Sequence, residues 1–159
     1  MSVKSNISRW IFASVAKHFD NRKETNYLHI DGMIRQTNKL PNYTELKVDG
    51  PYMVEMSRNY FNLIVEVNVY IQAQKSEKNA YLYLQILGIV QKSFTRCIPV
   101  YSYGNGPEDH SAFVGSLIIL QETGHRLMEN HAGQLKPSEE VNQSQIEGHY
   151  EMNLEMDNS

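Results

Sequence analysis

The sequence predicts an α+β domain, in which a mostly antiparallel β-sheet is packed by two α-helices and extended by a C-terminal extra strand or arm. Apolar residues recur at three- and four-residue steps near the N-terminus and again between Ala80 and Phe94, a spacing typical of amphipathic helices. Between these segments, Phe61–Gln72 places an apolar residue at every odd position, which indicates a strand with one buried face. A similar alternation returns at Gln145–Met156.

Length and composition restrict the class of protein. The chain has 159 residues, 41% of them hydrophobic and 21% charged, which excludes a disordered or collagen-like chain. Its length suits one domain that buries a core without metals or disulfides. No apolar stretch approaches the ~20 residues that a membrane helix needs, so no membrane partner is expected. The single cysteine, Cys97, lies in an apolar run and is interpreted as a small buried residue.

Charge is unevenly distributed along the chain. All 15 Lys and Arg lie at or before Lys136, against 12 Asp and Glu, so residues 1–136 carry a net charge of +3. The remaining segment carries −6. We therefore expect one α+β domain over residues 1–136 and an acidic C-terminal strand or arm over residues 137–159.

The first half of the chain is expected to contain a helix and a group of strands. A helix is predicted over Ser5–Phe19, and Leu28–Leu40 stays ambiguous because its polar content specifies a strand only weakly. Alternation predicts a strand at Tyr43–Val48. Asp49-Gly50-Pro51 has the composition of a turn, since Gly supplies positive φ and Pro fixes φ at the next position. Tyr52–Ser57 is then expected to return as a second strand.

The second helix and a strand pair follow the long strand. The helix is predicted from Ala80 to about Phe94, with Gly88 in its middle. Because Gly costs about 1 kcal/mol relative to Ala in a helix, close packing of Gly88 against the sheet is the expected compensation. Two strands are predicted at Ile98–Tyr103 and Phe113–Gln121. The loop between them is longer than a tight hairpin needs and is expected to project from the body.

The last third of the chain is less regular. Arg126–His131 is predicted to be a strand or a short helix, and Gly133–Ser138 has the composition of a linker. The alternation at Gln145–Met156 predicts a strand that carries a row of acidic residues on one face.

Residues that usually carry chemistry form no recognisable site. The six histidines are scattered and make no His-x-x-x-His pair, so they are interpreted as surface residues. The glycines near Asn105 precede acids and a strand, whereas a phosphate loop needs a following helix. Asp109-His110-Ser111 contains the residue types of a hydrolase triad, but sequence neighbours cannot adopt its geometry. The sequence thus predicts no catalytic residue, no cofactor and no metal, and no nucleic-acid-binding run.

Tyrosine is abundant, with ten residues in the chain. Seven of them cluster around the predicted strands and the second helix, where they either pack at the edge of the core or form a protein interface, in which Tyr is enriched. These seven are Tyr52, Tyr60, Tyr70, Tyr81, Tyr83, Tyr101 and Tyr103.

The order of these elements resembles the tail-terminator type of tailed-bacteriophage neck proteins. The resemblance covers roughly residues 5–121 and rests on the segment Tyr43–Tyr52 (YTELKVDGPY), the run Val65-Glu66-Val67-Asn68-Val69 in the long strand, the helix after it and the strand pair with a long loop. It implies a small α+β subunit of a six-membered ring that stops growth of the tail tube and joins the tail to the head-completion complex.

The same resemblance implies a structural virion protein rather than an enzyme, assembled in the host cytoplasm. Its implied partners are copies of itself, the tail tube protein, a head-completion or connector protein and, in a contractile tail, the sheath protein. DNA would pass through the channel without specific binding. Candidate subunit-interface residues lie in the strand pair with its loop and in the acidic segment: Tyr101, Tyr103, Asn105, Glu108, Asp109, Glu147, Glu151 and Glu155.

Two roles for the acidic face stay open at this point. Glu147, Glu151 and Glu155 either line the channel, where like charge keeps DNA from adhering, or pair with the +3 body of a neighbouring subunit. Alternative functions are another head-completion or baseplate subunit of the phage, or a non-viral protein-binding module.

Overall fold

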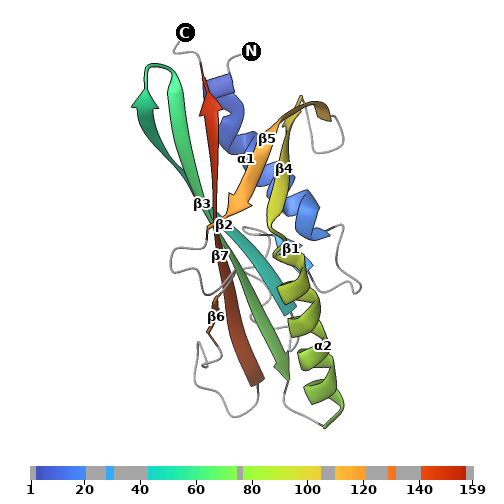
Figure 1. The fold of residues 1–159 in the computed structure, drawn as a ribbon. Coiled ribbons are helices and arrows are strands. Elements are labelled where there is room, and N and C mark those ends of the chain that lie inside the picture. Colours follow the sequence, from blue (N-terminus) through green and yellow to red (C-terminus); the bar gives the residue numbers. More distant parts are fainter. Residues whose placement is uncertain are drawn as a thin grey trace.

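The computed structural model describes residues 3–20, 28–30, 43–74, 77–104, 110–120, 129–131 and 141–156. Within them, two helices and seven strands follow one another along the chain (Figure 1). The elements are α1 (Val3–Asp20), β1 (Leu28–Ile30), β2 (Tyr43–Ser57), β3 (Tyr60–Gln74), α2 (Glu77–Ser93), β4 (Cys97–Tyr103), β5 (His110–Ile119), β6 (Glu129–His131) and β7 (Val141–Glu155). The predicted α+β class is confirmed, and residues 129–131 form a strand rather than a short helix.

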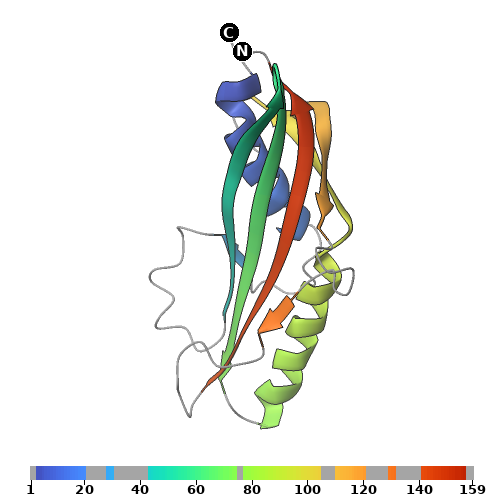
Figure 2. The same ribbon diagram turned by 60° about the vertical axis from the view of Figure 1, so that its left-hand side comes forward.

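The described strands form one sheet in the order β1-β2-β3-β7-β5-β4, with β6 paired to β7. Among them, β1 and β2 are the one parallel pair, and the other pairs are antiparallel. Three long strands, β2, β3 and β7, run side by side along the length of the molecule (Figure 2). The predicted, mostly antiparallel sheet is therefore present.

The C-terminal segment forms a strand, as its alternation predicts, but it is not an arm at the margin of the fold. β7 begins at Val141 and lies between β3 and β5, pairing with β3 from Gln74↔Val141 to Tyr60↔Glu155. One face of β7 is apolar and buried, so this strand completes the core as well as the sheet. The described part of the acidic segment, residues 141–156, is therefore an integral part of the domain.

The expected turn at Asp49-Gly50-Pro51 is wrong, because β2 continues through it. The pairing with β3 shifts there, from Asp49↔Glu66 to Tyr52↔Ile64, so the three residues form a β-bulge within one long strand. Gly50 has φ +103°, and a Cβ at this position would lie 2.8 Å from the Ile64 carbonyl oxygen. The chain actually reverses at 58–59, where Asn59 takes the left-handed conformation with φ 63°.

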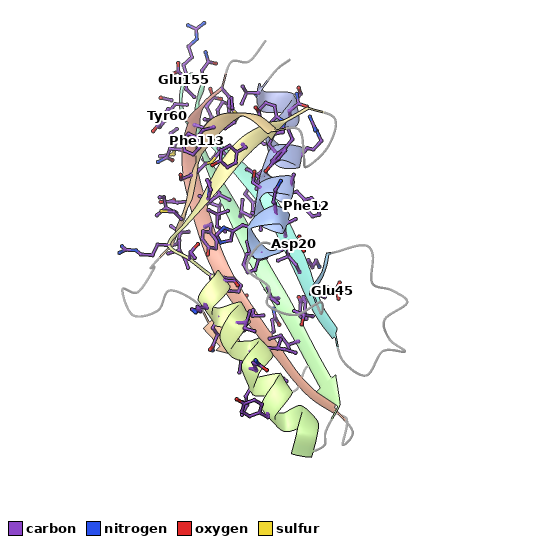
Figure 3. The ribbon with its side chains drawn as sticks, turned by 90° about the vertical axis from the view of Figure 1, so that its right-hand side faces the viewer. Phe12, Asp20, Glu45, Tyr60, Phe113 and Glu155 are labelled. Carbon is purple, nitrogen blue, oxygen red and sulfur yellow. The ribbon has the colours of Figure 1, made fainter. Side chains whose placement is uncertain are left out.

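Both helices pack on the same face of the sheet (Figure 3). The Lys4 ammonium of α1 lies 5.0 Å from the centroid of the Phe61 ring on β3, and the Phe94 ring at the end of α2 meets β7 at Gly148. The two helices also meet each other, since the rings of Phe19 and Phe94 pack edge to face at 5.0 Å. α1 buries the predicted stripe of Ile7, Trp10, Ile11, Val15 and Phe19.

Thr95 joins the ends of the two helices to the sheet. The His18 Nε2 lies 3.1 Å from the Ser93 carbonyl oxygen and 3.0 Å from Thr95 Oγ1, which in turn donates to the Cys97 carbonyl. The fully buried Tyr150 hydroxyl of β7 donates to the Thr95 carbonyl at 2.8 Å. Burial raises the pKa of the Tyr150 hydroxyl, so it remains a donor across the physiological pH range.

Two expectations about single residues are wrong. Gly88 is exposed, and nothing lies within 4 Å of the Cβ it lacks, because Ile86 and Val90 carry the buried side of α2. Cys97 is exposed rather than buried, since the alternation of β4 turns Ile98 inward and its neighbour outward. Within the described residues, neither helix is long and apolar enough to cross a membrane.

Candidate assembly surface

The face of the sheet opposite the two helices, here called the open face, consists of alternate side chains of β2, β3 and β7. The strand register arranges these side chains in rows across the sheet. The rows, written from β2 through β3 to β7, are Glu45–Tyr70–Gln145, Lys47–Asn68–Glu147, Asp49–Glu66–His149, Tyr52–Ile64–Glu151 and Val54–Asn62–Asn153. The face therefore changes from charged at one end to partly apolar at the other.

The β2–β3 hairpin ends in four exposed large side chains, here called the apolar tip. Tyr52, Val54, Met56 and Tyr60 are 68%, 51%, 64% and 42% exposed. The hairpin extends to one end of the molecule (Figure 1). Apolar side chains grouped in this way, rather than scattered singly, mark surfaces that bind a partner.

Among the described strands, the backbone of β2 also has an unpaired edge near the apolar tip. β1 pairs with β2 only through Leu46, so among the described strands nothing pairs with the outer edge of β2 from Lys47 onward. A long exposed edge beside apolar side chains is a template for association with another chain.

An exposed aromatic side chain of β5 lies at the same end of the molecule as the apolar tip. Phe113 of β5 is 61% exposed and packs edge to face on Tyr101 of β4, with ring centroids 5.9 Å apart. Figure 3 shows Phe113 at the same end of the molecule as Tyr60 and Glu155.

A second apolar group, here called the helix patch, lies on α2. Tyr81 is 77% exposed and Leu84 is 62% exposed, and their spacing of three residues places them on one side of the helix. α2 begins where β3 ends, so the helix patch and the apolar tip lie at opposite ends of the long strands (Figure 1). A 15-residue strand such as β3 spans about 50 Å.

The charged end of the open face contains a buried amide. Asn68 is 2% exposed, donates to Glu66 Oε1 at 3.1 Å and to Asp49 Oδ2 at 3.4 Å, and accepts from Gln145 Nε2 at 2.9 Å. These bonds link β2, β3 and β7 and oppose a slip of their register. The Lys47 Nζ lies 4.0 Å from Asp49 Oδ1, but an ion pair this exposed adds little to stability.

The acidic residues predicted for the interface share this open face. Glu147 and Glu151 are half-buried there, and Glu155 is exposed beside the apolar tip, where it pairs in register with Tyr60. Glu151 also accepts a hydrogen bond from Asn62 at 3.2 Å. The structure thus brings these three predicted residues together along β7.

The other predicted interface residues lie elsewhere. Tyr101 is half-buried on β4, whereas Tyr103 is 3% exposed and its carbonyl accepts the Trp10 Nε1 hydrogen at 2.9 Å. Tyr103 therefore belongs to the core of the chain. Asn105, Glu108 and Asp109 fall outside the described residues.

Sequence reasoning missed most of the apolar tip. Tyr52 and Tyr60 stood out only among the many tyrosines, and Val54 and Met56 were not singled out. The alternation of Tyr52, Val54 and Met56 could have indicated it, because these residues share one face of the strand. The half-buried Met53 lies on the opposite face, which leaves the first face for solvent or a partner.

No protein-family model and no curated protein matches this chain.

Proposed function

We propose that this chain is a structural subunit of the head–tail neck of a tailed bacteriophage, where copies of it form a ring that terminates the tail tube and joins it to the head-completion complex. The observation that carries the proposal is the apolar tip, in which Tyr52, Val54 and Met56 are each more than half exposed. A partner that covers these side chains would remove a large apolar surface from water.

Two separated patches suit a ring better than a simple dimer. A ring closed by head-to-tail contacts needs two different complementary patches on every subunit, whereas a two-fold dimer uses one patch twice. The apolar tip and the helix patch provide such a pair at opposite ends of the chain. The expectation of six subunits comes from the resemblance to tail-terminator proteins.

On this proposal, the three acidic side chains along the open face of β7 face the channel of the ring. Carboxylates at Glu147, Glu151 and Glu155 repel the phosphate backbone, so DNA passes without adhering. In the alternative arrangement these residues contact the basic part of a neighbouring subunit, and salt would then weaken the assembly by screening the charges. Sedimentation at low and high salt separates the two arrangements, because a ring held by apolar contacts persists at high salt.

Sedimentation velocity of the purified full chain also tests the proposal itself. We expect a closed oligomer of defined size at micromolar concentration, and we expect Met56→Ser together with Tyr52→Ser to convert it to monomers. Phe12→Ser, an exposed residue of α1 outside both patches, is the matched control and should leave the oligomer intact. A wild-type chain that stays monomeric would contradict the ring and favour a protein-binding module.

A further inference from the structure

We propose that Glu66, Glu147 and His149 on the open face form a binding site for a divalent transition-metal ion of the zinc class. Each of the three side chains offers one ligand atom, and these atoms all lie within 4.8 Å of one another. The site lies at the charged end of the open face and would bind an ion whether or not the chain belongs to a phage neck.

The three donors come from two hydrogen-bonded central strands. Glu66 of β3 and His149 of β7 are direct cross-strand partners, and Glu147 lies two residues before His149 on the same face. The backbone of His149 is held on the other side as well, because its carbonyl accepts the Leu120 N–H at 2.7 Å. The donors are therefore carried by a rigid part of the fold rather than by a loop.

The spacing of the donors is close to that of a bound ion. With metal–ligand bonds of about 2.0–2.2 Å, the donors of a tetrahedral zinc site lie about 3.4 Å apart. Each pair therefore needs to approach by at most about 1.4 Å, which rotation of the long Glu side chains can supply. All three side chains are half-buried, so an ion would be partly shielded from solvent.

Neighbouring residues orient one of the donors. The buried Asn68 amide donates to Glu66 Oε1 at 3.1 Å, and Asn68 is itself fixed by the amide of Gln145. Outer hydrogen bonds of this kind direct a ligating carboxylate and commonly accompany metal ligands.

The chemistry of the donors selects the class of ion. Carboxylate oxygens alone would suit Mg²⁺ or Ca²⁺, whereas the imidazole of His149 favours Zn²⁺ and related transition ions. Three protein ligands leave a fourth tetrahedral position for water. Spacing along the chain could not reveal this set, because Glu66 and His149 are brought together only by the pairing of β3 with β7.

Titration of the full chain with Co²⁺, after dialysis against a chelator, tests the site. Co²⁺ is used because its visible absorption reports a ligated ion, and Zn²⁺ should then displace it. We expect saturable binding of one ion per chain that weakens as the solution is acidified, since His149 must be unprotonated to ligate. Glu66→Gln and His149→Gln should each weaken Co²⁺ binding at least about tenfold. Loss of a residue that only orients a ligand already costs about that much, and loss of a ligand itself should cost no less.

Glu155→Gln is the matched control, because it removes an exposed carboxylate from the same face of the same strand. It should leave Co²⁺ affinity unchanged. Circular dichroism checks that each variant is folded, and Glu147→Gln replaces any variant that is not. Absence of saturable binding to the wild-type chain, or equal binding by all folded variants, would overturn the proposal.

Discussion

Gly148 of β7 lies directly against the ring of Phe94, so that a Cβ at position 148 would stand 2.7 Å from Phe94 Cδ1 and 2.9 Å from Cε1. The ring has little freedom to move away, because it is buried and packs edge to face on Phe19 of α1. This single contact connects the central strand to the ends of both helices.

Gly148→Ala is therefore expected to destabilise the chain. Overpacking of a filled core typically costs 1–3 kcal/mol, and we expect a loss of about 2 kcal/mol in the free energy of unfolding. Urea unfolding of the wild-type chain and of Gly148→Ala, at equal protein concentration, measures this loss. Unchanged stability would mean that Phe94 can retreat from β7.

Gly88→Ala is the opposite case and provides the matched control. Position 88 is exposed in α2, and nothing lies within 4 Å of the missing Cβ. Because Ala is the better helix former, this change should stabilise the chain by about 0.5–1 kcal/mol. A destabilised Gly88→Ala variant would contradict the open position of Gly88 on α2.

Tyr150→Phe should lower stability by about 1–2 kcal/mol at neutral pH, because the Thr95 carbonyl loses the buried donor that binds it at 2.8 Å. Burial raises the pKa of the Tyr150 hydroxyl in the folded chain above its ordinary value of 10.0. The stability contributed by the protonated group is complete below the unfolded pKa and is lost as pH rises beyond it.

The wild-type chain should therefore lose stability above about pH 10 more steeply than the variant, and the difference between them should narrow. Denaturant unfolding between pH 8 and 11 measures this trend. Tyr81→Phe, at an exposed position, should behave as the wild type does. A constant difference between wild type and Tyr150→Phe across this range would contradict the effect of burial on the Tyr150 pKa.

The two-patch arrangement predicts complementation between variants. A chain with Tyr52→Ser and Met56→Ser keeps its helix patch, and a chain with Tyr81→Ser and Leu84→Ser keeps its apolar tip. Each variant alone should be monomeric, whereas an equal mixture should form dimers through the one intact pair of patches. Sedimentation velocity of the three samples measures this outcome.

All four substitutions fall on exposed side chains, so each variant should unfold at nearly the wild-type denaturant concentration. A mixture that stays monomeric although each variant has lost association would exclude a contact between tip and helix patch. The apolar tip would then bind some other surface.

Much of the fold could be predicted because its periodic segments are long. The stripe of α1 and the alternation of β3 each specify a buried face over many residues, and both were correctly predicted. The turn at Asp49-Gly50-Pro51 was wrong because a local turn composition also fits a bulge when pairing with β3 continues on both sides. Alternation likewise identified β7 as a strand but carries no information on its neighbours in the sheet.

The candidate surfaces were less predictable, because they depend on how distant segments of the chain pack together. The acidic residues of β7 could be assigned to one face from their spacing alone, and the structure places them so. Exposure of Tyr52 and Met56 depends on which elements cover the hairpin, and the proximity of Glu66 to His149 depends on strand register. Both are long-range properties that periodicity in one segment does not encode.

Electron microscopy of the purified full chain mixed with assembled tail tubes tests the central claim most directly. The proposed function predicts class averages of a closed ring with a central channel, and rings seated on one end of tubes whose growth has stopped. Single particles with no rotational symmetry, together with tubes that elongate unchanged in the presence of the protein, would contradict it.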